Sequence, residues 1–103
     1  MLAEKAYLIV GLDTDGSVTP VDSGMDRMIS KTKDFIGKRS LSRPDSVREG
    51  RKQLVGLLTE DSTKVLPEGG QIVKEPDGPI PAAMIGHVTS SYWSANLNRS
   101  IAM

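Results

Sequence analysis

The stretch that decides the fold is Met84-Ile-Gly-His-Val-Thr-Ser-Ser-Tyr-Trp-Ser-Ala-Asn-Leu-Asn-Arg-Ser-Ile-Ala-Met103. We predict one strand at residues 84–93, a tight polar turn at 94–99, and the opening of a second strand at 100–103. The second strand has hardly begun where the sequence stops, so its backbone donors and acceptors would need a partner from elsewhere. We therefore expect the chain to be a segment of a longer protein.

Tyr92 and Trp93 are adjacent in the first of these strands. Successive side chains of a strand point to opposite faces of the sheet. We therefore expect one of the two rings to lie in the core and the other to be exposed, where it would suit contact with a partner or ligand.

Further strands are expected between residue 50 and this stretch. Residues 52–59, around Leu54-Val-Gly-Leu-Leu58, have a strand pattern, and a brief strand is predicted at 71–74. The turn before it is Pro67-Glu-Gly-Gly70, because glycine supplies the backbone conformations that a tight turn needs. Residues 75–81 contain three prolines and are predicted to form an irregular loop.

The first 45 residues are expected to contain two short helices. One begins with Thr19 as N-cap and Pro20 at its first position, and it closes at Gly24. The other covers Lys33–Leu41 and ends before Pro44, since the residue before a proline avoids the helical region. The other expected elements are a strand buried on both faces at 7–10, a turn at 13–16 and an extended segment at 25–29.

The predicted fold class is α+β and mostly β. Because helical patterns cease near residue 50, we predict a boundary there: residues 1–49 would form an α+β remnant and residues 50–103 the start of an antiparallel β domain, which the resemblance described below implies to be an incomplete antiparallel β-barrel. At 103 residues, the whole chain is the size of one small domain.

Composition excludes several classes of function. The 13 basic and 13 acidic residues cancel and form no long block, which argues against a nucleic-acid or membrane partner. Cysteine is absent and there is one histidine, so disulfides and thiolate metal sites are excluded and we expect no metal site. Apolar runs are too short for a membrane span, and we expect a cytoplasmic protein. The basic run at residues 48–52 contains Glu49 and is interpreted as a solvated face.

No catalytic residue can be assigned from the sequence. His87 lies in a strand pattern without a recognisable nucleophile or orienting partner, which favours a structural histidine. Asp13 and Asp15 lack the remaining ligands of a calcium loop and are interpreted as turn residues. Gly69-Gly70 lacks the context of a phosphate-binding loop. The serines at 90, 91 and 94 have no acid or base at a recognised spacing, and Glu4 on its own would be a surface carboxylate.

Several motifs in combination nevertheless resemble the aminomethyltransferases, the family of the glycine cleavage T-protein. They are Thr19-Pro-Val-Asp-Ser-Gly24, Asp34-Phe-Ile-Gly-Lys-Arg-Ser-Leu41, Leu54-Val-Gly-Leu57, Leu66-Pro-Glu-Gly69 and Ile85-Gly-His-Val-Thr-Ser90 through Ser100-Ile-Ala-Met103. Two others, Val10-Gly-Leu-Asp-Thr-Asp-Gly16 and Lys38-Arg-Ser-Leu-Ser-Arg-Pro-Asp45, resemble the branch formed by the large (alpha) subunits of heterotetrameric sarcosine oxidases. Asn98 stands where relatives usually have glycine, which fits a left-handed turn position.

This resemblance implies the end of a folate-binding domain followed by the first part of a C-terminal β-barrel. Proteins of that branch bind tetrahydrofolate, which captures the one-carbon unit of sarcosine as 5,10-methylenetetrahydrofolate and leaves glycine. Their FAD, FMN and NAD sites lie on other domains and subunits. Glu4, in Leu2-Ala-Glu-Lys5, matches the family glutamate that contacts the pterin ring, while the family's catalytic aspartate has no counterpart.

The resemblance implies folate and other sarcosine oxidase subunits as partners, and a segment that is inactive by itself. The alternative is a stand-alone β-barrel-type binding or scaffolding module without catalysis. Because the barrel cannot close with the strands present, its open edges are templates for pairing with another chain. We therefore expect a homo-oligomer.

Overall fold

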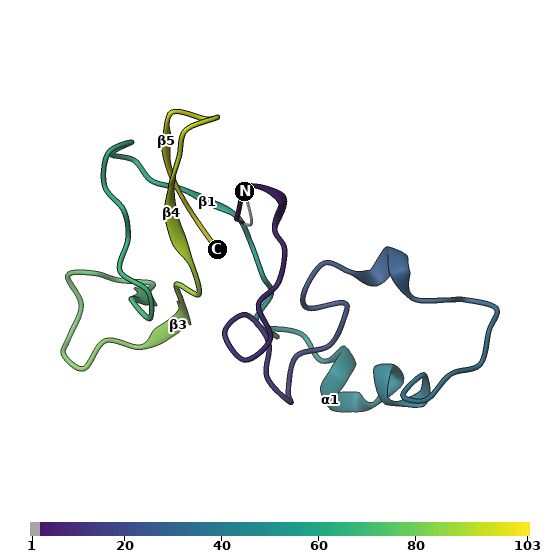
Figure 1. Ribbon diagram of the computed structural model, residues 1–103. Helices are drawn as coiled ribbons and strands as arrows, with labels where there is room; N and C mark the ends of the chain where they lie inside the picture. The colour runs from purple at the N-terminus through teal and green to yellow at the C-terminus, as the bar shows by residue number, and fades with distance from the viewer. Residues whose placement is uncertain (1–2) are drawn as a thin grey trace.

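The computed structural model describes residues 3–103, whose regular elements are short (Figure 1). They are the 3-10 helices η1 (Ala3–Lys5), η2 (Asp26–Met28) and η3 (Arg39–Ser42), the helix α1 (Pro44–Val47), and the strands β1 (Leu57–Leu58), β2 (Gln71–Val73), β3 (Met84–His87), β4 (Ser91–Ser94) and β5 (Arg99–Ala102). The described chain is therefore mostly irregular, with antiparallel strands after residue 50 and single helical turns before it.

The last strands form a three-stranded antiparallel sheet in the order β1-β5-β4. β4 and β5 are the arms of a hairpin in which Tyr92 pairs with Ile101 and Ser94 with Arg99. Asn98, in the connecting turn, has a φ of 53°, the left-handed conformation expected for this position. β1 pairs along the other side of β5, so β5 is the central strand.

A second sheet pairs β2 with β3, and its separation from β4 corrects the prediction of one strand at 84–93. The break falls at residues 88–90, where the backbone changes partner. Val88 exchanges hydrogen bonds with the 67–70 turn, donating to the Gly70 carbonyl at 2.9 Å and accepting from the Gly69 N–H at 2.8 Å. The next two residues bond to Met103 instead.

The backbone of residues 100–103 has its partners within this chain, contrary to our expectation. Ser100 donates to the Ser62 carbonyl at 2.7 Å, and the Thr89 N–H donates to the Met103 carbonyl at 2.8 Å. The Met103 N–H donates to the Ser90 carbonyl at 2.9 Å. β5 can therefore be fully paired because segments 59–62 and 88–90 lie beside it.

The apolar core is small and lies around β5. Val88, Ile101, Ala102 and Met103 are the buried hydrophobic residues among those described, and they share the interior with several buried serines and threonines. Tyr92 and Trp93 are both exposed, so the expectation that one ring is buried is wrong. Tyr92 is 44% and Trp93 45% exposed, so each ring is only partly covered by the rest of the described chain.

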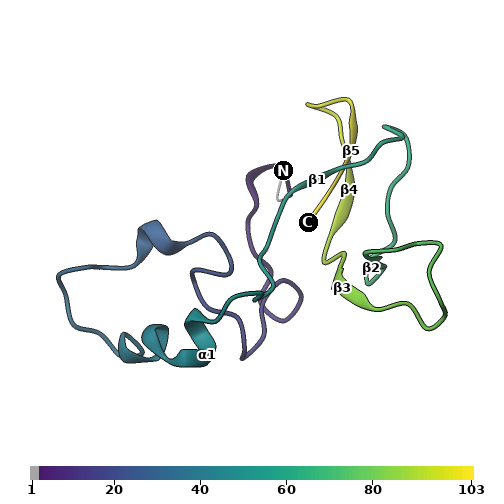
Figure 2. The same ribbon diagram turned by 180° about the vertical axis from the view of Figure 1, so that it is seen from behind.

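The described chain is open rather than closed into a barrel. Its radius of gyration is 16.0 Å, whereas a compact domain of this length has about 13 Å. Figures 1 and 2 show the reason: α1 and the wide loop before it lie at the opposite end of the molecule from β3, β4 and β5. The incomplete barrel that we predicted is thus supported only as open antiparallel sheets.

The predicted buried strand at 7–10 is wrong. Val10 is 90% exposed, and among residues 3–103 it pairs through an isolated bridge to Thr14. The backbone turns here because the N–H groups of Leu12 and Asp13 both donate to the Ile9 carbonyl. The turn therefore begins at Ile9, inside the apolar run at 7–10, and this run does not form a strand of either sheet.

The predicted helix at 19–24 is a single hydrogen-bonded turn. Thr19 and Asp22 cap each other: the Thr19 N–H donates to Asp22 Oδ2 at 2.9 Å, and the Asp22 N–H donates to Thr19 Oγ1 at 3.3 Å. Gly24 ends the turn with a φ of 75°, which favours glycine. The prediction that Thr19 caps this segment and that Gly24 ends it is therefore confirmed, although the segment is one turn long rather than a helix.

The other helix and strand boundaries also shifted. The segment predicted as extended at 25–29 contains η2, and the helix predicted at 33–41 is reduced to turns and η3. Pro44 begins α1 as its first residue rather than ending a helix, although Arg43 before it is extended as expected. The strand predicted at 52–59 is confined to β1, because Leu54 donates its N–H to the Asp22 carbonyl at 2.8 Å.

Candidate functional site

The N-terminal turn η1 is tied to the β4–β5 hairpin through the carboxylate of Glu4. Ser94 Oγ, at the end of β4, donates a hydrogen bond to Glu4 Oε1. Asn96 Nδ2, in the hairpin turn, donates to Glu4 Oε2 at 2.8 Å. Each carboxylate oxygen thus accepts a hydrogen bond from a different residue of one hairpin, which fixes both the position and the plane of the carboxylate.

Ser94 is well placed to hold this contact. Ser94 is only 2% exposed. Its Oγ also accepts a hydrogen bond from the Leu97 N–H at 3.1 Å. The hydroxyl therefore accepts from its own turn while it donates to Glu4. Because the same oxygen closes the turn and holds the carboxylate, the shape of the hairpin and the orientation of Glu4 depend on one group.

The electrostatics of this contact favour the charged form of Glu4. The hydrogen bonds from Ser94 and then from Asn96 lower the pKa of Glu4 from 4.5 to about 2. Hydrogen bonds donated to a carboxylate stabilise its ionised form. At neutral pH the site is a half-buried, oriented anion that suits a ligand with paired N–H donors.

A second polar cluster surrounds the guanidinium of Arg51, which is 11% exposed. Arg51 Nε donates to both oxygens of Asp22 at 3.0 and 3.1 Å, and Nη2 donates to Asp22 Oδ2 at 2.5 Å. Nη1 donates to the carbonyl and carboxylate of Asp45 at 3.1 and 3.2 Å, and Nη2 to the Ser17 carbonyl at 2.6 Å. These partners occupy all three nitrogens of the guanidinium.

Arg51 corrects our interpretation of residues 48–52 as a solvated face. Its hydrogen bond lowers the pKa of Asp22 to about 2, and Asp22 in turn raises the pKa of Arg51. Because every guanidinium nitrogen is engaged by the protein, the cluster joins the 17–22 segment, α1 and the start of the strand region. Its chemistry is that of a structural ion pair rather than a ligand site.

The other polar residues considered above do not converge. His87 lies on β3 opposite Gln71 and is exposed. Asp15 accepts from the N–H and hydroxyl of Ser17, as a turn residue does, and these bonds lower its pKa. Within residues 3–103, no three histidine, cysteine, aspartate or glutamate side chains gather as a metal site.

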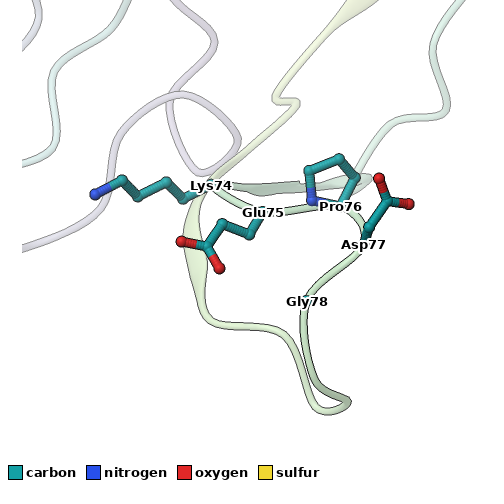
Figure 3. A pocket seen from close by; sticks show the side chains of 5 residues that line it. All are labelled: Lys74, Glu75, Pro76, Asp77 and Gly78. Atoms are coloured by element: carbon teal, nitrogen blue, oxygen red, sulfur yellow. The ribbon is translucent and has the colours of Figure 1, made fainter.

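Two hollows lie away from Glu4. One, of about 350 Å³, borders the loop after β2, where Figure 3 shows Lys74, Glu75 and Asp77 pointing in different directions rather than toward a common point. The other, of about 540 Å³, is apolar, contains no titratable lining residue, and is bordered by Met25, Met28, Phe35 and Ile36 among others. Neither presents the convergent polar groups that fix a ligand. In the part of the chain that is described, no helix is long and apolar enough to cross a membrane.

Comparison with known proteins identifies the family of the region that contains the antiparallel sheets. Residues 52–103, just over half of the chain, match the family described as the glycine cleavage T-protein C-terminal barrel domain. The chain belongs to this family.

Individual relatives extend the match to nearly the whole chain. It is 50% identical over 105 residues to the sarcosine oxidase subunit alpha of Corynebacterium sp. (strain P-1), covering 98% of this chain and 11% of the relative. The corresponding subunit of Rhizobium meliloti (strain 1021) is 32% identical over 92 residues, which are 88% of this chain and 9% of that subunit. An aminomethyltransferase of Clostridium botulinum (strain Okra / Type B1) is 35% identical over 103 residues, 97% of this chain and 25% of the relative. The chain thus resembles a small part of each relative's length.

The structure brings Glu4 together with residues that sequence reasoning did not assign to a site. Ser94 was interpreted as a turn residue, and Asn96 was not considered. The pairs are separated by 90 and 92 positions in the sequence. The only available signal was the position of both residues in the polar turn of the decisive C-terminal stretch.

Proposed function

We propose that this chain is a segment of a sarcosine oxidase alpha subunit or aminomethyltransferase-like protein that binds tetrahydrofolate. The whole protein would transfer the one-carbon unit of sarcosine to the folate, giving 5,10-methylenetetrahydrofolate and glycine. The observation that carries this proposal is the 50% identity to a sarcosine oxidase subunit alpha across 98% of the chain. Tetrahydrofolate would supply the nitrogens that accept the one-carbon unit.

In this proposal Glu4 contacts the pterin ring of the folate. A carboxylate can accept hydrogen bonds from the 2-amino group and the neighbouring ring N–H together. Glu4 is ionised at neutral pH, as an ordinary glutamate is, and the hairpin donates a hydrogen bond to each of its oxygens. These properties fit the task, since a fixed anion loses little freedom when the ligand binds.

The remaining machinery is proposed to lie outside the chain. We infer that FAD, FMN and NAD bind other domains and subunits of a cytoplasmic sarcosine oxidase complex, and that this segment alone does not catalyse the reaction. We also propose a division near residue 50 between the end of a folate-binding domain and the barrel region. The start of the family match at residue 52 supports this boundary.

Replacement of Glu4 by glutamine tests the folate site. We expect calorimetry with 5-formyltetrahydrofolate to detect weak binding to the unmodified chain, and Glu4→Gln to weaken it by about tenfold or more. Glutamine keeps the shape of the side chain but loses the charge and replaces one acceptor by a donor. Glu68→Gln, at an exposed position of the 67–70 turn, is the matched control and should bind as the unmodified chain does. Equal affinities of all three proteins, or none, would refute the proposed site.

We further propose that the isolated chain self-associates. β1 and β4 are the edges of an open sheet, and exposed apolar side chains such as Trp93 and Leu58 lie on them. Unpaired strand edges recruit further strands, and burial of apolar surface contributes about 25 cal/mol per Å². Light scattering should therefore show a mass at least twice that of one chain, rising with concentration. A monomer at the highest soluble concentration would contradict this expectation.

A further inference from the structure

The β4–β5 hairpin brings two residues of the barrel region to the carboxylate that is proposed to contact folate. We propose that Ser94 and Asn96 are positioning residues for the folate site: they orient the Glu4 carboxylate for the paired N–H donors of the pterin. This inference rests on the proposed function and extends it, because it assigns part of the site to the far end of the chain. The observation behind this inference is that η1, which contains Glu4, lies against the turn of the β4–β5 hairpin.

The geometry explains why two donors are needed. The terminal torsion of a carboxylate is broad and has no sharp minimum, and donors on both oxygens restrict it more than a donor on one oxygen does. Ser94 holds Oε1 and Asn96 holds Oε2 at 2.8 Å, so the plane of the carboxylate is set by two points. Since the two oxygens together offer about four acceptor positions, one bond from the hairpin to each is compatible with further donors on the same oxygens.

The two donors also differ in burial, which gives them different tasks. Ser94 is buried and is itself fixed by the Leu97 N–H, so it serves as the rigid anchor. Asn96 is exposed, and its amide reaches the second oxygen from the solvent side. A variant at Asn96 therefore changes the carboxylate with little effect on the core, and it is the more informative test.

Asn96→Asp is the decisive variant, with Asn98→Asp as its matched control. Both substitutions add the same charge to the same turn, and aspartate tolerates the left-handed backbone of position 98. Only Asn96→Asp replaces the amide that donates to Glu4 Oε2 with a second carboxylate beside it. We expect Asn96→Asp to weaken binding of 5-formyltetrahydrofolate by about tenfold and Asn98→Asp to change it by less than about twofold.

A second measurement separates positioning from a general loss of structure. The titration of the Glu4 carboxyl carbon, followed by ¹³C NMR, should move upward toward the ordinary glutamate range in Asn96→Asp and in Ser94→Ala. In Asn96→Asp, which leaves the Ser94 hydroxyl and its bond to the turn in place, the amide shifts of β5 should not change. Ser94→Thr, which keeps a hydroxyl, should retain more of the folate affinity than Ser94→Ala does.

The outcomes distinguish this inference from the proposed function. If the unmodified chain binds folate and Glu4→Gln does not, but Asn96→Asp and Ser94→Ala bind as well as the unmodified chain, the positioning role is refuted and the folate site stands. If the titration of Glu4 is the same in all variants, the hairpin does not control the carboxylate and the inference is likewise refuted. If the unmodified chain binds no folate, the proposed function fails, and the positioning role fails with it.

Discussion

Arg51→Met is expected to lower the free energy of unfolding by roughly 3–5 kcal/mol, measured by urea denaturation followed by circular dichroism. The substitution removes the partner of Asp22, which is 5% exposed in the ion pair. A buried carboxylate without its counter-charge retains its desolvation cost and loses the compensating attraction. A loss of this size approaches the whole stability of a small domain.

Arg48→Met is the matched control for this prediction. Arg48 forms an ion pair with Asp45, but the two side chains are 56% and 78% exposed. Exposed pairs contribute about 0–1 kcal/mol, so this variant should unfold close to the original urea midpoint. If both arginine variants shifted the midpoint equally, the distinction between a buried structural pair and a surface pair would be wrong.

The same ion pair predicts how stability depends on pH. The pKa of Asp22 is lowered in the folded chain from 3.8 to about 2, so its contribution is fully present above the unfolded pKa and disappears as the pH falls from about 4 to about 2. The contribution is up to about 2 kcal/mol. Thermal unfolding at a series of pH values should therefore show the unmodified chain losing up to about 2 kcal/mol of its advantage over Arg51→Met within this window. A constant difference between the two proteins across the window would contradict the assignment.

Ile101→Ala is expected to cost about 2–4 kcal/mol, because it removes the largest aliphatic side chain of a very small core. Ile101 is 6% exposed and lies at the centre of the three-stranded sheet, opposite both Tyr92 and Leu58. Deleting its outer carbons leaves a cavity that the paired strands cannot close without breaking their register. Few other buried apolar residues are described that could take over its contacts.

Ile36→Ala is the corresponding control, since it makes the same substitution at a fully exposed isoleucine. Its cost should be within about 0.5 kcal/mol of zero. Thermal and urea unfolding of the two variants can be compared directly because the chemical change is identical. A large loss for Ile36→Ala with none for Ile101→Ala would place the stabilising contacts at residues 25–41 rather than around β5.

Local sequence signals predicted the turns better than the strands. The 67–70 turn, the strand after it and the polar turn between β4 and β5 were anticipated, as was the left-handed conformation of Asn98. These features depend on residues close together in sequence, chiefly on the backbone preferences of glycine, proline and asparagine. The run at 7–10 was misassigned because apolar β-branched residues favour a strand only when a neighbouring strand is available.

The break at residues 88–90 shows the limit of such patterns. The sequence from Met84 to Trp93 has no glycine or proline at the break itself, so nothing local interrupts the strand. The interruption comes from competition between two sets of backbone partners, the 67–70 turn on one side and Met103 on the other. Such competition is a property of the assembled fold, because each buried backbone group takes whichever partner the fold brings near.

By itself, the sequence determined the family, the mostly β character and the identity of Glu4 as the candidate ligand residue. Only the tertiary structure showed what holds that residue, since Ser94 and Asn96 lie 90 and 92 positions away. The structure also showed that Arg51, which we had interpreted as part of a solvated face, forms an ion pair with Asp22, 29 positions away in the sequence. The physical reason is that hydrogen bonds and ion pairs depend on distance and burial in the folded chain, whereas propensities and turns depend on neighbours in the sequence.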